Sequence, residues 1–128
     1  MRKIIIAGSS KFHKEALDLK TELEKNNYEV IDYTKKIDEE KEYKYAYETF
    51  YKNINKTDDL LVLNMDKNNI EGYIGYETFA EMSYLIANNI ITNNDNRKIF
   101  LYKIPSKKLG CYDEIMQFLK LGYIQIYK

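Results

Sequence analysis

The 128-residue chain is poor in the residues that build disulfides and metal centres. It has one cysteine, Cys111, and one histidine, His13. A single cysteine excludes a disulfide within the chain and fits a reducing cytoplasm, where we expect the protein to reside. With one histidine and one cysteine, no zinc or iron site of normal ligand count can be assembled without many carboxylates. We therefore expect no metal and no cofactor.

Long apolar runs and clusters of like charge are absent as well. The apolar run at residues 4–7 is too short for a signal peptide and breaks at Gly8, and no later run reaches the length of a membrane helix. The 20 basic and 20 acidic side chains balance, with no charged tail of the kind that binds nucleic acid. We therefore expect a soluble protein that binds neither a membrane nor a nucleic-acid polymer.

Three motifs that would assign a function are also missing. There is no G-x-G-x-x-G and no lysine-bearing P-loop, so neither a Rossmann dinucleotide site nor a Walker ATPase is supported. Gly-x-Ser-x-Gly is absent and His13 lies on an unsuitable segment, so a Ser-His-Asp hydrolase is not supported. No internal repeat or linker divides the chain, and its length is usual for one domain, which we predict over residues 1–128.

Short apolar runs alternate with segments of helical periodicity. Five runs rich in Ile, Val, Leu, Phe or Tyr predict strands at residues 3–7, 28–32, 60–64, 98–102 and 123–127. Apolar residues at helical spacing predict helices at about residues 12–26, 43–54, 78–89 and 113–121. This alternation predicts an α/β fold, namely a flavodoxin-like three-layer sandwich with a five-stranded parallel sheet of order roughly 2-1-3-4-5.

A ligand site is expected where the strand order reverses, at the carboxyl ends of the first and third strands. The first strand runs into Gly8-Ser9-Ser10, whose free N–H groups and hydroxyls can hold a phosphate or a sugar hydroxyl. A tight turn with Ser10 as a helix N-cap is the alternative. The third strand runs into Asn64-Met65-Asp66, a second polar segment at the same edge.

Residues 61–66 and 72–82, together with the strand and turn at residues 4–12, resemble the nucleoside 2-deoxyribosyltransferase-like family, which includes deoxynucleotide N-glycosidases. In that family a strand with a polar end is followed by a glycine-bearing loop and a helix that carries the catalytic glutamate. The resemblance implies that Glu81 is this nucleophile. An ionised carboxylate stabilises the oxocarbenium-like state of N-glycosidic cleavage and then forms a glycosyl ester.

The resemblance also implies a substrate site and a partner. The ligand is expected to be a small-molecule nucleoside or nucleotide, with the serine turn on its sugar or phosphate. Family members are commonly homo-oligomers that share residues between chains, so a dimer or larger assembly is expected. The implied substrate-binding residues are Gly8, Ser9, Ser10, Phe12, Asn64, Asp66, Tyr73, Gly75 and Glu77.

Other interpretations of the same residues remain open. Family members often have a tyrosine in the first strand that positions the glutamate, but this chain has Ile5 there, which favours a non-catalytic nucleotide-binding module. A glycohydrolase that acts on another ribosyl nucleotide, such as NAD, is a further alternative.

Helical periodicity alone gives a different expectation for Glu81. It places Glu81 with Glu77 and Asn88, on the side away from Phe79 and Met82, which is typical of a solvated face. In the preceding helix, tyrosines recur at helical spacing. Such a stripe is typical of a core or an oligomer face and less often of an aromatic lid. The tyrosines concerned are Tyr43, Tyr45, Tyr47 and Tyr51.

Overall fold

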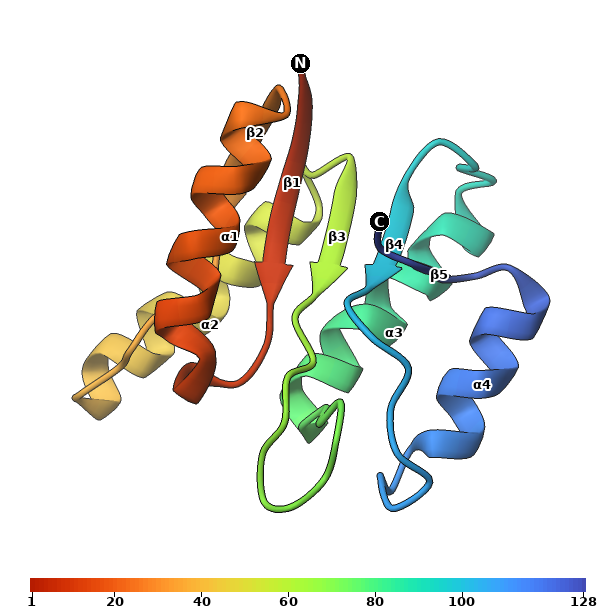
Figure 1. The fold of residues 1–128 in the computed structure, drawn as a ribbon. Helices are drawn as coiled ribbons and strands as arrows, with labels where there is room; N and C mark the ends of the chain where they lie inside the picture. Colours follow the sequence, from red (N-terminus) through yellow and green to blue (C-terminus); the bar gives the residue numbers. More distant parts are fainter.

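Five strands and four α-helices alternate along the chain, as the sequence pattern predicts (Figure 1). The structure is a computed structural model that describes all residues from 1 to 128. The elements in chain order are β1 (Arg2–Ala7), a 3-10 turn η1 (Ser10–Phe12), α1 (His13–Lys25), β2 (Tyr28–Asp32), α2 (Glu40–Ile54), β3 (Asp59–Val62), α3 (Tyr76–Ile91), β4 (Lys98–Leu101), α4 (Tyr112–Leu121) and β5 (Gln125–Ile126).

The sheet has the predicted order β2-β1-β3-β4-β5, and all of its strand pairs are parallel. Its central strands end level with one another, because Ala7 lies opposite Val62 and Val62 lies opposite Leu101. The last residue of β2, Asp32, lies opposite Ile5 of β1. The carboxyl ends of the strands and the segments that follow them therefore gather along one edge of the sheet.

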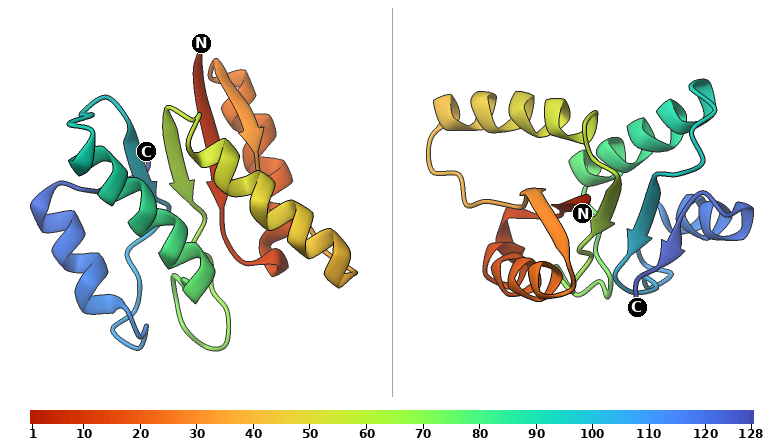
Figure 2. Two further views of the ribbon diagram at one scale, coloured as in Figure 1. Left: turned by 180° about the vertical axis from the view of Figure 1, so that it is seen from behind. Right: turned by 90° about the horizontal axis from the view of Figure 1, so that it is seen from above.

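The two faces of β1 pack against different helices, which produces the three layers. Ile4 and Ile6 contact the apolar stripe of α1, whereas Ile5 and Ala7 belong to the core that contains α3. Figure 2 shows α1 on one face and α2 and α3 on the other. Because neither face of the central strands reaches water, their sequences are continuous apolar runs, not alternating ones. The flavodoxin-like α/β class is thus confirmed.

Most element ends lie within about two residues of their predicted positions. The predicted helix end at residue 121 is confirmed, because Gly122 adopts the left-handed conformation, with φ +81°, directly after α4. The last strand is shorter than predicted, since only Gln125–Ile126 pair with β4 at the edge of the sheet. None of the helices combines the length and apolar character that crossing a membrane requires.

Of the tyrosine stripe of α2, Tyr51 alone packs against the core. Ile54, at the end of the helix, is its one buried residue, and Tyr43 and Tyr47 are each 41% exposed. Figure 2 shows the reason: the first turns of α2 extend outward past the sheet. The interpretation of Tyr43 and Tyr47 as core residues is therefore wrong.

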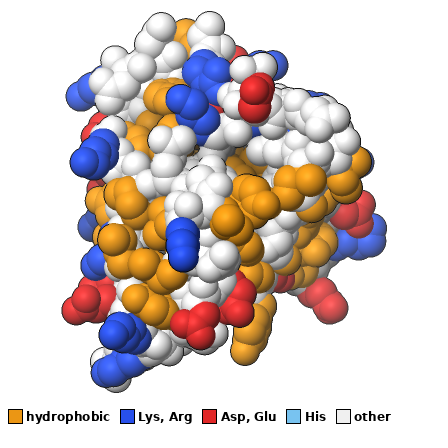
Figure 3. All heavy atoms as spheres, turned by 90° about the vertical axis from the view of Figure 1, so that its right-hand side faces the viewer, with side chains coloured by type: hydrophobic (Ala, Val, Ile, Leu, Met, Phe, Trp, Pro, Cys, Tyr) orange, Lys and Arg blue, Asp and Glu red, His pale blue; other side chains and the backbone are white.

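Hydrophobic side chains are also spread, with charged ones among them, over the face on the α4 side of the molecule (Figure 3). Leu121 and Tyr123, at and just after the end of α4, are 54% and 41% exposed. Exposed apolar surface often marks protein contacts. The homo-oligomer that the family resemblance implies stays a prediction.

Candidate functional site

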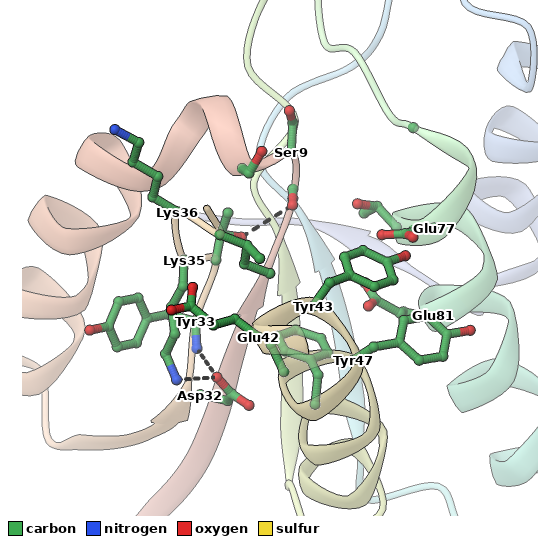
Figure 4. A pocket seen from close by; sticks show the side chains of 18 of the residues that line it. Ser9, Asp32, Tyr33, Lys35, Lys36, Glu42, Tyr43, Tyr47, Glu77 and Glu81 are labelled. Carbon is green, nitrogen blue, oxygen red and sulfur yellow. Dashed lines mark hydrogen bonds and ion pairs between the residues drawn. The ribbon is translucent and has the colours of Figure 1, made fainter. Parts of the chain in front are cut away.

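A cavity of about 1220 Å³ opens at the carboxyl edge of the sheet. Four segments line it: the turn after β1, the segment after β2, the first turns of α2, and the β3–α3 loop with the start of α3. Figure 4 shows side chains from these segments around one space. The cavity lies where the strand order reverses, as expected for a doubly wound sheet.

The glycine-serine turn lies in this cavity. Gly8 is required for its shape, because a Cβ there would stand 2.9 Å from the carbonyl oxygen of Leu63. Ser9 caps η1 by accepting a hydrogen bond from the Lys11 N–H at 3.3 Å, so the N-cap role falls to Ser9 and not to Ser10. Ser10 also lines the cavity.

A cation that the sequence analysis missed stands beside this turn. The Nζ of Lys67 donates a hydrogen bond to the Ser9 hydroxyl at 2.9 Å and lies 4.9 Å from the ring centre of Tyr73. Lys67 forms no ion pair with a carboxylate of the chain. A hydroxyl and an uncompensated ammonium group thus meet at one end of the cavity, where an anionic group of a ligand can bind.

The end of β2 contributes a buried carboxylate that the sequence analysis also missed. Asp32 is 5% exposed and accepts hydrogen bonds from the Tyr33 N–H at 2.8 Å and from the Asn53 amide at 2.9 Å. Its other contact is an ion pair with Lys35 at 3.2 Å. Asp32 therefore ties β2 to α2 while its carboxylate borders the cavity.

Glu81 lies in the second turn of α3 and is only 9% exposed, so its expected place on a solvated face is wrong. The buried stripe of α3 includes Thr78 and Glu81 alongside Met82 and Leu85. Because Thr78 and Glu81 are polar, apolar periodicity does not count them in the buried stripe and places the buried side of α3 elsewhere. Glu81 is buried because this side of α3 lies next to α2, and residues of both helices line the cavity, as Figure 4 shows.

The environment of Glu81 is electrostatically unusual. Its carboxyl group forms no hydrogen bond within the chain, yet no fully buried side-chain oxygen or nitrogen lacks a partner. The Glu81 oxygens therefore reach the cavity. Burial, and then the charges of Glu77 and Asp32, raise the pKa of Glu81 to about 8. A positive charge forming in the cavity would favour the ionised carboxylate and offset this effect.

The remaining predicted residues fall into two groups. Tyr73, Gly75 and Glu77 line the cavity with Glu81. Gly75 is the N-cap residue of α3, and a Cβ at this glycine would lie 3.5 Å from the Tyr73 ring, in ordinary contact. These three residues therefore form the wall next to Glu81.

Phe12, Asn64 and Asp66 lie outside the cavity. Phe12 is buried against α1. Asn64 donates to the carbonyl oxygens of Gly72 and Lys103 and accepts from the Lys103 N–H. Asp66 accepts from the Gly72 N–H and from Lys103 Nζ, and the Lys103 contact, followed by that of Gly72, holds its pKa below the ordinary value. Asn64 and Asp66 thus fasten the β3–α3 loop that carries the cavity wall.

The side chains of the cavity do not form a metal centre, because no group of three or more His, Cys, Asp or Glu side chains is placed to hold a metal ion. Comparison of the chain with protein-family models, with curated proteins and with solved structures finds no match.

Proposed function

We propose that the protein cleaves or transfers the N-glycosidic bond of a (deoxy)nucleoside or its 5′-phosphate, with Glu81 as the nucleophile. The observation that carries the proposal is the position of Glu81. It is a nearly buried carboxyl group without a protein partner, and it opens into a large cavity that also contains Ser9 and Lys67. Buried carboxyl groups with a strongly shifted pKa are concentrated at functional sites.

The chemistry suits this arrangement. As the bond from C1′ to the base nitrogen lengthens, positive charge develops on the sugar, and the Glu81 carboxylate stabilises it and bonds to C1′. The base leaves with the bonding electron pair and takes up a proton from solvent. Water then attacks C1′, which releases the sugar and restores the carboxylate, with loss of one proton. In a transferase a second base attacks in place of water.

Ile5 supports a second candidate, a nucleotide-binding module without catalytic activity. Ile5 is fully buried in the core and brings no hydroxyl group toward Glu81. Such a module would use the same cavity and leave the bound ligand intact.

Release of free base distinguishes the two candidates. The full chain is incubated with a panel of nucleosides, deoxynucleosides, their 5′-monophosphates and NAD, and the products are separated by chromatography. We expect free base from one substrate class and no release by Glu81→Gln. Glu114→Gln, an exposed glutamate of α4 outside the cavity, serves as the matched control and should retain activity. Tight nucleotide binding with no product from any member of the panel would favour the binding module and contradict the enzyme.

A further inference from the structure

Four tyrosine rings form a continuous series from α2 to α3, here called the tyrosine ladder (Tyr43, Tyr47, Tyr51 and Tyr84). Tyr43 and Tyr47 are stacked with centroids 5.9 Å apart and planes 20° apart. Tyr47 packs on Tyr51 at 5.1 Å, and Tyr51 meets Tyr84 edge to face at 5.8 Å. Aromatic pairs in these geometries are attractive beyond their buried area.

The two ends of the ladder have different surroundings. Tyr51 packs against the core, and Tyr84, which is 38% exposed, donates a hydrogen bond to the Asn55 side chain at 3.0 Å. These contacts fix the α3 end of the ladder. Tyr43 and Tyr47 line the cavity and are each 41% exposed. Tyr51, which Tyr84 supports in turn, thus holds Tyr47 and Tyr43 in place. These two rings therefore have little conformational freedom left to lose on binding.

The other tyrosines that line the cavity either have a lysine over the ring or lack a neighbouring ring that holds them in place. Tyr33 has Lys35 at 5.2 Å from its ring centre, and Tyr73 has Lys67 at 4.9 Å. Tyr45 and Tyr76 are 74% and 97% exposed, and neither stacks on another ring. Tyr43 and Tyr47 have only each other and Tyr51 as aromatic partners and carry no cation over their faces. Their free surface suits a flat, uncharged aromatic group.

These two rings also lie close to the proposed reaction centre. Figure 4 shows Tyr43 and Tyr47 reaching toward the part of α3 that carries Glu77 and Glu81. A carboxylate that attacks C1′ must lie close to this atom, and C1′ is also the atom to which the base is bonded. The base is therefore confined to the neighbourhood of Glu81, where the outer end of the ladder offers two aromatic rings that are held by their neighbours and have no cation over them.

We propose that Tyr43 and Tyr47 form the binding wall for the ligand's purine or pyrimidine base, which stacks on their exposed faces. The inference rests on the proposed function for the identity of the ligand, but it concerns binding and not bond cleavage. Stacking on an aromatic ring changes base affinity by roughly tenfold to a hundredfold per ring and is tolerant of the base's identity.

The test measures binding by calorimetry in the Glu81→Gln background, so that no turnover disturbs the titration. The probes are the four 2′-deoxynucleoside 5′-monophosphates and 2-deoxyribose 5-phosphate, which is the same molecule without a base. Tyr47→Leu and Tyr43→Leu remove the rings, and Tyr47→Phe and Tyr43→Phe remove only the hydroxyl groups. Tyr123→Leu is the matched control, since Tyr123 has the same 41% exposure and lies outside the cavity.

We expect each leucine variant to weaken binding of the monophosphates by roughly tenfold or more while the phenylalanine variants and Tyr123→Leu retain it. Binding of 2-deoxyribose 5-phosphate should be the same in all variants.

Three results would overturn the proposal: equal losses of affinity for all probes, no loss for any probe, or no binding of any monophosphate to the Glu81→Gln protein with both tyrosines intact. A change of molecular mass in sedimentation caused by Tyr43→Leu or Tyr47→Leu would overturn it too, because it would identify the ladder as a contact between copies. If the leucine variants lose affinity as expected but the wild-type protein turns over no substrate, the base-binding proposal is supported and the enzymatic proposal fails.

Discussion

Glu77 stands one helical turn before Glu81 on α3, and both carboxyl groups border the same cavity (Figure 4). After burial, the charge of Glu77 is the next cause of the raised pKa of Glu81, and that of Asp32 follows. Burial, together with these neighbouring carboxylates, thus keeps Glu81 largely in its neutral form near pH 7. A nucleophile held in this way must lose its proton before it can attack.

This relationship predicts the pH dependence of the reaction. Because the attacking form of Glu81 is ionised, kcat/KM should rise with pH and level off above about 8. Glu77→Gln removes a neighbouring negative charge, which lowers the pKa of Glu81, so the rise should move to lower pH. The measurement is a pH–rate profile of both proteins, with Glu114→Gln as the control. A rate that falls as pH passes 8 would make Glu81 a proton donor and contradict its role as nucleophile.

Stability should depend on the same group. In the unfolded chain Glu81 titrates near 4.5, whereas in the folded protein its pKa is about 8. The folded state therefore binds more protons between these values, so the free energy of unfolding falls as pH rises from 4.5 to 8.

Glu81→Gln removes this pH-dependent loss. Its stability relative to the wild type should increase by up to a few kcal/mol between pH 4 and pH 8, since one pKa unit corresponds to about 1.4 kcal/mol. Urea unfolding at both pH values measures the difference, and Glu114→Gln, at an exposed position of α4, is the control. A difference between Glu81→Gln and wild type that does not vary with pH would show that Glu81 is not buried in solution.

Lys67 should distinguish phosphorylated from unphosphorylated ligands. Its ammonium group meets the Ser9 hydroxyl without a carboxylate partner, so a phosphate bound there would form a charge-assisted hydrogen bond. We expect Lys67→Ala to weaken binding of a deoxynucleoside 5′-monophosphate by roughly tenfold, which corresponds to about 1.5 kcal/mol for a hydrogen bond to a charged group. Binding of the deoxynucleoside should change little. Lys11→Ala, an exposed lysine after Ser9 outside the cavity, is the control, and equal effects of Lys67→Ala on both ligands would contradict a phosphate contact.

Asn64 should matter for stability and not for chemistry. Asn64→Ala leaves the Lys103 N–H and the Lys103 carbonyl without their side-chain partner, and each buried polar group left unpaired costs about 1–3 kcal/mol. We expect a loss of that order in thermal or urea unfolding. Asn26→Ala, at an exposed position after α1, should change stability by less than about 0.5 kcal/mol. If the two variants unfold alike, the β3–α3 loop is not fastened by Asn64.

The architecture could be predicted from the sequence because its signals are local. The continuous run at residues 4–7 is what a strand covered on both faces requires, and the apolar spacing of Ala16, Leu19 and Leu23 is the face that α1 buries. Right-handed crossovers then leave few ways to arrange five such strands. The sheet order follows from these rules without reference to any site.

The cavity depends on contacts between distant segments, which the sequence pattern does not reveal. Asp32 is the last residue of a predicted strand and Lys67 lies in a polar stretch that resembles an ordinary loop. Only the fold brings them into one cavity with Ser9 and Glu81. Glu81 was misplaced by periodicity because a carboxylate within a buried stripe is rare and counts as polar surface in a helical wheel. Tyr43 and Tyr47 are exposed because the first turns of α2 extend past the sheet, and this placement of the helix is also a tertiary feature.

The attack of Glu81 on C1′ is tested most directly by trapping the glycosyl ester. A substrate with fluorine at the 2′ position slows the second step, since fluorine destabilises the oxocarbenium-like state through which the ester breaks down. Intact-protein mass spectrometry should show an added mass equal to the fluorinated sugar, or sugar phosphate, with release of one base. Peptide mapping should place this mass on Glu81, and Glu81→Gln should show none. Release of base without any adduct, or an adduct on Glu77, would contradict the account.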